Sequence, residues 1–207
     1  MTKETPEKKL AALKAIYAEY EAQAASFKAQ AVCAPGCAYC CTHYGHLDMT
    51  TLEGLRLQHG LQALSKAQQR RLSKKINANR KAKEAGKTSV CPFLSPDKTC
   101  CIYQLRPFSC RQLYSLKKCG EHGPIVHPQA VELAKDTILR IQALDATGYS
   151  GHITYVLALL DKPGFYRRYV SGGFDPSQVA AFGRSHGLII NSAVLRRNSE
   201  TRGDSMI

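Results

Sequence analysis

The chain has 207 residues, and its 29 Lys and Arg against 16 Asp and Glu give a net charge of +13. One domain fits this length, and a hydrophobic content of 44% excludes a wholly disordered chain. The longest apolar run, residues 153–160, is too short for a membrane span, which needs about 18–20 residues. The first residues lack the apolar core of a secretory signal, so we expect a cytoplasmic chain that makes no membrane contact.

Two helices are predicted in the first part of the chain. Residues 5–31 begin with Thr5 as a cap and Pro6 at the first helical position, and their apolar residues recur every three or four positions. A shorter helix follows the capping-box pattern of residues 50–53 and is expected to end near Gly60.

A longer and strongly basic helix is predicted over residues 65–85. Ser65 and Gln68 form a second capping signal, and Gly86 closes the helix. Residues 66–87 contain nine Lys or Arg and one Glu, a distribution that could follow the phosphates of a nucleic acid. The candidate phosphate contacts are Arg70, Arg71, Lys74 and Lys75. A solvated basic face is the favoured alternative, because the helix has no aromatic residue on which a base could stack.

The C-terminal part of the chain is also predicted to be helical, and it shows no strong strand pattern. Helices are expected over residues 128–148, 150–161 and 175–187, the last opened by an Asp-Pro cap. The polar residues 196–207 are predicted to form a flexible tail. A short helical turn is expected at residues 109–116, within irregular loops rich in proline.

The nine cysteines lie in two groups between residues 33 and 119. They are Cys33, Cys37, Cys40 and Cys41, and then Cys91, Cys100, Cys101, Cys110 and Cys119. Cytosolic thiols stay reduced, so this density favours metal binding or redox chemistry over disulfides. A C-x2-C step with partners from a distant segment is typical of a thiolate metal site. We predict a mainly α fold, one domain over residues 1–195, with helices wrapped around an irregular cysteine-rich metal-binding loop region.

The adjacent pair Cys40 and Cys41 bears on the number of metal ions. Two consecutive side chains rarely reach one mononuclear ion without strain, so the pair favours two centres or one polynuclear cluster. Eight thiols would suit two zinc ions, while four cysteines also hold an iron–sulfur cluster, so both metals stay open. His43 and His46 follow closely and could replace a thiolate, although the supply of cysteines makes this the weaker expectation.

These motifs resemble the YkgJ-type cysteine-cluster family, which is named for a CxxCxxCC signature and described as zinc- or iron-chelating. The resemblance covers about residues 33–119 and rests on the residues from Cys33 to Cys41 and on the motifs CPFL, CCIY and RPFSCR of the second group. It implies the shared metal ligands Cys33, Cys37, Cys40, Cys41, Cys91, Cys100 and Cys110. It also implies that Cys119 is a less regularly placed ligand and Cys101 a spare thiol. The related flagellin lysine N-methylase has a similar region associated with an iron–sulfur cluster, which favours iron slightly.

Three further residues are expected beside the metal. Four thiolates around zinc leave a net charge of about −2, which N–H groups of Arg106 and Arg111 could offset, unless these arginines pair with carboxylates instead. Tyr103 and its apolar neighbours are expected to keep water from the site.

The function predicted from the sequence is therefore metal binding with a structural or redox role. One alternative is a cluster-dependent transferase or redox enzyme, by analogy with the methylase, with a pocket lined by residues 128–187 that reaches the cysteine site. The other is nucleic-acid binding through the basic helix. The sequence contains no catalytic constellation, so whether the chain is an enzyme, and which protein or small molecule it meets, stay open.

Overall fold

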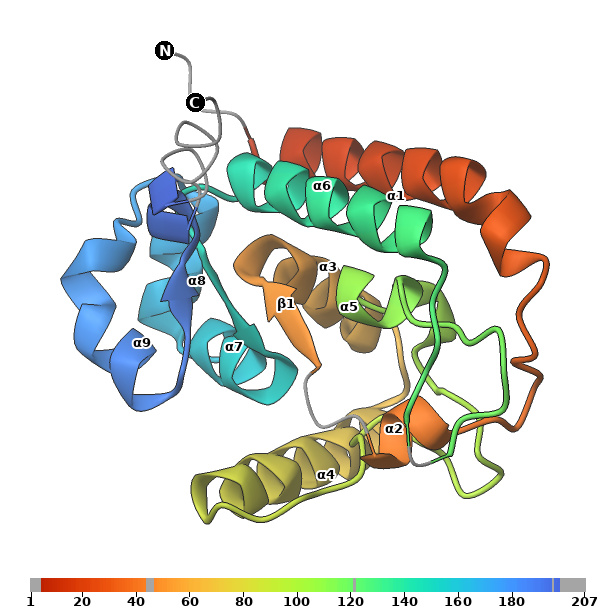
Figure 1. Ribbon diagram of the computed structural model, residues 1–207. Coiled ribbons are helices and arrows are strands. Elements are labelled where there is room, and N and C mark those ends of the chain that lie inside the picture. Colours follow the sequence, from red (N-terminus) through yellow and green to blue (C-terminus); the bar gives the residue numbers. More distant parts are fainter. Residues whose placement is uncertain (1–4, 44–46, 121, 195, 198–207) are drawn as a thin grey trace, which may run out of the picture.

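The computed structural model describes residues 5–43, 47–120, 122–194 and 196–197. Helices form most of it and surround a small antiparallel sheet with the strand order β1–β2–β3, which confirms the mainly α prediction (Figure 1). The α-helices are α1 (Pro6–Lys28), α2 (Tyr39–His43), α3 (Thr51–Gln62), α4 (Lys66–Glu84), α5 (Phe108–Arg111), α6 (Pro128–Leu144), α7 (Ile153–Leu160), α8 (Pro163–Val170) and α9 (Ala180–Ser185). The 3-10 helices are η1 (Tyr103–Leu105) and η2 (Pro176–Val179), and the strands are β1 (Asp48–Thr50), β2 (Tyr149–His152) and β3 (Ile189–Ile190).

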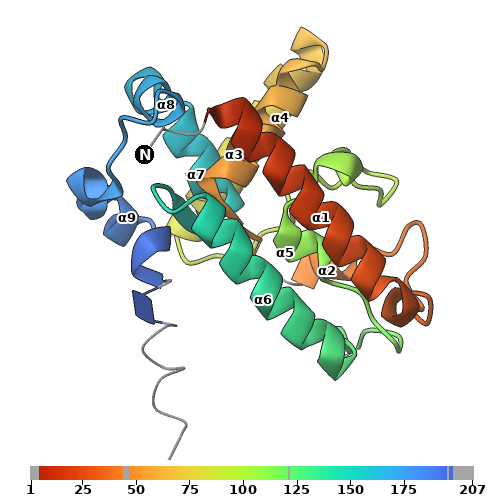
Figure 2. The same ribbon diagram turned by 90° about the horizontal axis from the view of Figure 1, so that it is seen from above.

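Helices α1 and α6 lie side by side and form one wall of the molecule (Figures 1 and 2). The predicted cap of α1 is present, because Thr5 Oγ1 accepts a hydrogen bond from Lys8 N at 3.4 Å. The helix ends at Lys28 instead of residue 31. Its apolar stripe packs against α6 and against Phe108 of α5, so the wall also holds the short helix that carries Cys110.

The sheet was not predicted, and residue 150, expected to open a helix, lies in a strand. β2 pairs with β1 through Met49 and Gly151, and α7 begins only after it, at Ile153. A side chain at Gly151 would meet Leu188, since an added Cβ would lie 2.3 Å from Leu188 Cδ2. Strands of two to four residues are too short for alternation to show in a sequence, which explains the error.

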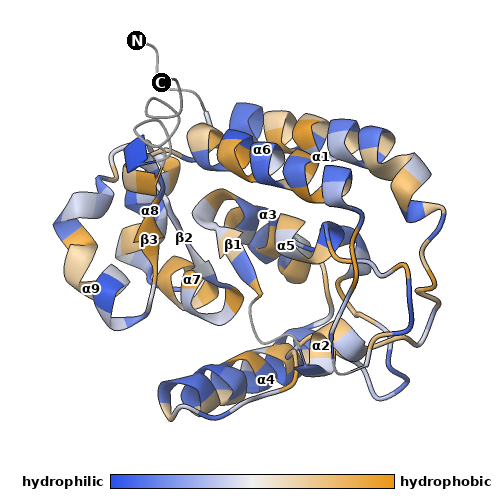
Figure 3. Ribbon diagram, in the orientation of Figure 1, coloured by the Kyte–Doolittle hydropathy of each residue, from blue (hydrophilic) through white to orange (hydrophobic). Residues whose placement is uncertain are grey.

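The capping box predicted for α3 is present, but the helix continues past Gly60 to Gln62. Gly60 lies inside the helix because Leu105 packs on it: an added Cβ would lie 2.2 Å from Leu105 Cδ1. The glycine therefore serves a close contact with η1 and does not end the helix. α3 packs against the apolar helix α7, and together they form the centre of the core (Figure 3).

Several predicted helix boundaries in the C-terminal part are wrong. The sequence around Pro163 does end α7, but Pro163 also opens α8, since proline suits a first helical position. The helix expected over residues 175–187 divides into η2 and α9, and the helix from Pro128 ends at Leu144, before residue 148.

Helix α4 follows its prediction closely. Its capping box joins Ser65 and Gln68, and it buries only Leu72 and Asn79, so most of its surface is hydrophilic (Figure 3). It packs against α7 and projects from the body of the molecule (Figure 1).

The flexible tail predicted for residues 196–207 falls largely outside the described residues. Its described residues, 196–197, are helical, as are residues 191–194 before them. None of the helices among the described residues combines the length and the apolar character that crossing a bilayer requires.

Candidate metal centre

The two cysteine-bearing segments, far apart in the sequence, meet in the structure. Cys91 N donates a hydrogen bond to the carbonyl oxygen of Cys41 at 2.8 Å, and the side chains of the same two residues are hydrogen-bonded. All nine cysteines are free thiols. The convergence is therefore held by backbone contacts and not by a disulfide.

Four thiols gather next to this junction, and we call them the Cys91 group. They are Cys41, Cys91, Cys100 and Cys110. A loop closed by the hydrogen bond from Ser95 N to Thr99 O, 2.8 Å, and by a bridge between Leu94 and Cys100 returns the chain from Cys91 to Cys100. Helix α5 supplies Cys110 from the side of the core.

Backbone amides donate to two sulfur atoms of this group. The N–H of Phe93 donates to the Cys91 sulfur, and the N–H of Ile102 donates to the Cys100 sulfur. In both cases the donor lies two residues after the cysteine. Such bonds favour the thiolate form, which is the form that binds a metal ion.

The pKa values in the Cys91 group follow from burial and from these contacts. The hydrogen bond from the Cys91 thiol lowers the pKa of Cys41 to about 7, while the same bond and burial raise the pKa of Cys91. Burial raises the pKa of Cys110 to about 12. The positive charge of Arg106 favours the thiolate form and lowers the pKa of Cys41, Cys100 and Cys110.

The other four predicted ligands lie together in a second set, which we call the Cys119 group. They are Cys33, Cys37, Cys40 and Cys119. Pro35 and Gly36 occupy the middle of a tight turn in which Cys37 N donates to Ala34 O at 2.9 Å, and the φ of +85° at Gly36 is one that glycine adopts without strain. The turn brings the side chains of Cys33 and Cys37 into contact.

A separate set of hydrogen bonds attaches Cys119 to this turn. Val32 N donates to Ser115 O at 2.9 Å, and the N–H of Ser115 donates to the Cys33 sulfur. The hydroxyl of Tyr39 donates to Gly120 O at 2.7 Å. Burial and the neighbouring thiolates, first Cys119 and then Cys33, raise the pKa of Cys40 to about 11.

These thiols are gathered but not arranged as a finished coordination sphere. Among the described residues, no three His, Cys, Asp or Glu side chains have the geometry to hold an ion. The donor set nevertheless fits zinc or an iron–sulfur cluster, because both are bound by four thiolates.

The three residues predicted beside the metal have different surroundings. Arg106 lies over the ring of Tyr103, 3.5 Å from its centroid, and acts on the Cys91 group. Arg111 instead lies over Tyr17, and its Nη1 is 3.6 Å from a carboxylate oxygen of Glu21 on α1. Arg106 can thus offset thiolate charge, whereas Arg111 ties α5 to α1.

Cys101 and the two histidines near the first cysteine group have surroundings of their own. Cys101, predicted to be a spare thiol, is exposed and lies in the field of Lys75 and Arg71. The ring of His43 stacks on Tyr39, with 4.4 Å between ring centroids. His46 lies outside the described residues.

The basic residues proposed to contact phosphates lie on α4. Arg70, Arg71 and Lys74 are exposed. Lys75 is half-buried, and its Nζ donates to Leu94 O at 3.0 Å, so this lysine holds the Cys91–Cys100 loop.

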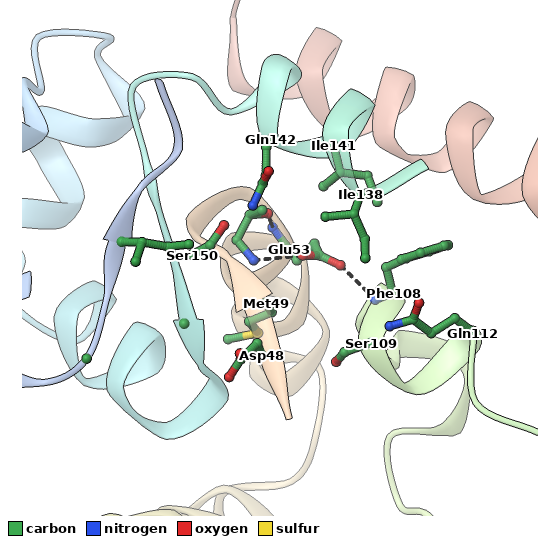
Figure 4. Close-up of a pocket in the computed structure, with 14 residues that line it drawn as sticks. Asp48, Met49, Glu53, Phe108, Ser109, Gln112, Ile138, Ile141, Gln142 and Ser150 are labelled. Atoms are coloured by element: carbon green, nitrogen blue, oxygen red, sulfur yellow. Dashed lines mark hydrogen bonds between the residues drawn. The ribbon is translucent and has the colours of Figure 1, made fainter. Parts of the chain in front are cut away.

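A buried carboxylate that the sequence analysis missed positions α5. Glu53 Oε1 accepts a hydrogen bond from Phe108 N at 2.7 Å, and Oε2 accepts one from Thr50 N at 2.7 Å (Figure 4). Oε1 also accepts a hydrogen bond from the hydroxyl of Tyr17 at 2.5 Å. The capping box identified Glu53 as a helix cap, but nothing in the sequence signals its bonds to α1 and α5. Through Phe108 this residue fixes the helix that carries Cys110.

A cavity of about 430 Å³ lies behind α5 (Figure 4). Its walls come from β1, α3, α5, α6, β2, Gly187 and Ile189. Gln142 Oε1 is buried without a hydrogen-bond partner among the described residues, whereas the Ser109 hydroxyl is hydrogen-bonded to the Cys110 thiol. The two side chains line the cavity from opposite walls. Because Ser109 precedes Cys110, one short helix separates the cavity from the Cys91 group.

The fold and the site together define an α-helical protein with a converging, reduced cysteine cluster. The model of the CxxCxxCC family, described as "Putative zinc- or iron-chelating domain", matches residues 32–137, and the chain belongs to this family. The match extends from the first cysteine through the first half of α6. No curated protein and no solved structure matches the chain.

Proposed function

We propose that this protein chelates iron or zinc through its cysteine cluster and that the bound metal has a structural or redox role. The observation that carries the proposal is the junction of Cys41 with Cys91, which joins two thiol-bearing segments without a disulfide. Family membership supports metal binding. Reduced thiols also support a cytoplasmic location, where thiols are kept reduced.

An iron–sulfur cluster is the favoured form of the metal. The gathered donors are all sulfur, and the ring of His43 is stacked on Tyr39. Each group therefore offers the four thiolates that an iron–sulfur cluster takes. Zinc would be held by the same four-thiolate donor set, with a purely structural consequence. Metal identity therefore decides between a redox and a structural role.

Anaerobic purification followed by elemental analysis and a visible spectrum tests this proposal. We expect a brown protein that absorbs near 400 nm for iron–sulfur, or a colourless protein with stoichiometric zinc. Cys110→Ser should release metal, whereas Cys101→Ser should not, because Cys101 is exposed and lies in the field of Lys75 and Arg71. A chain that binds neither metal at a fixed stoichiometry would refute metal chelation.

The cavity behind α5 favours a second candidate function, a cluster-dependent enzyme. Its volume suits a small molecule, and its unpartnered polar atom, Gln142 Oε1, could orient one. The cavity and the Cys91 group lie on two sides of α5, and the Ser109 hydroxyl, which lines the cavity, is hydrogen-bonded to the Cys110 thiol.

Ligand screening by thermal shift tests the second candidate. We expect a methyl-donor or redox cofactor, such as S-adenosylmethionine or a nicotinamide nucleotide, to raise the melting temperature of the metal-loaded protein. Gln142→Leu should abolish that shift while leaving the metal content unchanged. If neither cofactor changes the melting temperature, these cofactors do not bind in the cavity.

A further inference from the structure

We infer that the cysteine cluster is two separate four-thiol metal sites, one formed by the Cys91 group and one by the Cys119 group, with Cys40 and Cys41 bound to different metals. This inference rests on the proposed metal binding and assigns each of the eight thiols to a centre. Cys101 belongs to neither.

The first step is the direction of the two adjacent side chains. Cys40 and Cys41 are consecutive residues of α2, and consecutive side chains of an α-helix point about 100° apart around its axis. Two such thiols cannot both turn to one ion without unwinding the helix. Because α2 lies between the two groups, it presents one thiol to each.

The second step is that each group has its own scaffold. Val32 N, next to the first cysteine turn, bonds to Ser115 O, and the Tyr39 hydroxyl, at the start of α2, bonds to Gly120 O, so both contacts lead to the segment that bears Cys119. The bond between Cys91 N and Cys41 O joins the middle of α2 to the other segment. The two cysteine-bearing segments are therefore attached independently, and each attachment positions its own set of thiols.

The third step is which thiols lie close enough to influence one another. Among the thiols, Cys119 has the strongest electrostatic influence on Cys40, followed by Cys33, whereas Cys41 is hydrogen-bonded to Cys91. Cys41 and Cys100 act electrostatically on Cys110. Among the described residues, the interaction that crosses between the groups is the one between the chain neighbours Cys40 and Cys41.

The fourth step is chemical. Each group contains four thiols, the number that completes a tetrahedral zinc site or holds one iron–sulfur cluster. Eight thiols in one undivided polynuclear centre would instead require all eight to share neighbours, which the separate contacts of the two groups do not provide.

The matched variants Cys40→Ser and Cys41→Ser test this assignment, because they change neighbouring residues of one helix. Both are made in a Cys101→Ser background, loaded with metal anaerobically and treated with iodoacetamide, and the alkylated cysteines are mapped by mass spectrometry. We expect Cys40→Ser to lose one centre and expose Cys33, Cys37 and Cys119, with the other set protected. Cys41→Ser should expose Cys91, Cys100 and Cys110 instead. Alkylation of the same cysteines in both variants would overturn the inference.

A variant-free measurement covers the case in which a substitution unfolds the chain. The metal-loaded Cys101→Ser protein is exposed to limiting chelator and then alkylated, and intact molecules are weighed. Two independent sites give molecules with four labels confined to one group, alongside molecules with none or eight. An undivided centre gives only none or eight, and this result would overturn the inference.

Metal chelation and the division into two sites are distinguishable in these experiments. If the protein retains no metal before any substitution, the proposed function fails and the inference fails with it. If the protein retains metal but the labelling shows one undivided set of eight thiols, metal chelation stands and only the division into two sites is wrong.

Discussion

The Cys91 group and the Cys119 group use the same ligand chemistry on very different supports. Cys91, Cys100 and Cys110 pack against the main hydrophobic core, next to Phe93 and Ile102. Cys33 and Cys37 are exposed, and their support is a turn and a loop. A metal in the Cys91 group would therefore hold core elements together, whereas a metal in the Cys119 group would order surface segments.

This difference suggests a division of roles between two metals. Structural metal binding contributes directly to the folding free energy, because the site exists only in the folded chain. The segments that bear Cys91, Cys100 and Cys110 also bury Phe93, Ile102 and Phe108 in the core, so a metal that joins them would stabilise the core itself. A metal in the Cys119 group, by contrast, would be accessible from solvent through the exposed Cys33 and Cys37. We therefore expect a metal in the Cys91 group to have the larger effect on stability.

The largest expected effect separates the two groups by stability. Cys110→Ser should lower the free energy of unfolding of the metal-loaded protein by more than about 4 kcal/mol, because it breaks the site that ties α5 to the core. Cys37→Ser should cost only about 1–2 kcal/mol. Denaturant unfolding followed by circular dichroism measures both. Equal losses in the two variants would contradict the division of roles.

The second effect tests whether the helical wall has its own pH dependence, apart from the metals. Burial raises the pKa of Asp145, at the end of α6, to about 7, against an ordinary value of 3.8. Between these values the folded chain binds more protons than the unfolded chain, so this group makes stability fall as the pH rises from about 4 to 7. The full change is on the order of 4 kcal/mol.

Asp145→Asn removes this titration. The unfolding free energy of the wild type minus that of the variant should decrease from pH 4 to pH 7 and stay level above about pH 8. Metal loss at low pH affects both proteins and is removed by the subtraction. Tyr169→Phe removes the hydroxyl that donates to Asp145 Oδ1 at 2.6 Å, so it should move the decrease to higher pH. A difference that does not change with pH would disprove the assignment.

Helices with their own start signals could be predicted from the sequence, and elements that depend on distant contacts could not. The caps at Thr5, Thr50 and Ser65 all form as expected, because a cap is a contact within four residues. The sheet was missed because its strands are set by pairing between residues about 100 positions apart. Gly60 was misread because the packing of Leu105, not the local sequence, explains it.

The candidate site shows the same limit at the level of single residues. The spacing of the cysteines predicted two groups of thiols, and the adjacent pair Cys40 and Cys41 favoured either two centres or one polynuclear cluster. The spacing could not show that Cys119 joins the first group, because that follows from hydrogen bonds at Ser115 and Gly120. Nor could it show that Arg111 faces Glu21, on a helix some 90 residues away.

The third effect concerns the support of the Cys91 group. Glu53→Gln keeps the size of the side chain but removes the charge that holds Phe108 N and Tyr17, and should cost about 2 kcal/mol. Metal should also leave the Cys91 group faster, while the Cys119 group is unaffected. Glu132→Gln is the control: Glu132 is an exposed carboxylate 2.7 Å from Lys135 Nζ, and its loss should change stability by less than about 0.5 kcal/mol. If the two variants behave alike, Glu53 does not position α5.

The smallest effect isolates the charge beside one group. Arg106 lowers the pKa of Cys41, Cys100 and Cys110, and no such influence reaches Cys33 or Cys40 within the described part of the chain.

Arg106→Gln should therefore speed metal release from the Cys91 group about 10-fold, the lower end of what a lost outer contact to a metal site costs, because Arg106 is only half-buried. The rate is measured by transfer of metal to a chromophoric chelator, with alkylation identifying the group that has opened. Release from the Cys119 group is the internal control and should not change. Arg106→Lys keeps the positive charge and should restore most of the metal retention. If the lysine variant releases metal as fast as the glutamine variant, the arginine acts through its contact with Tyr103 and not through its charge.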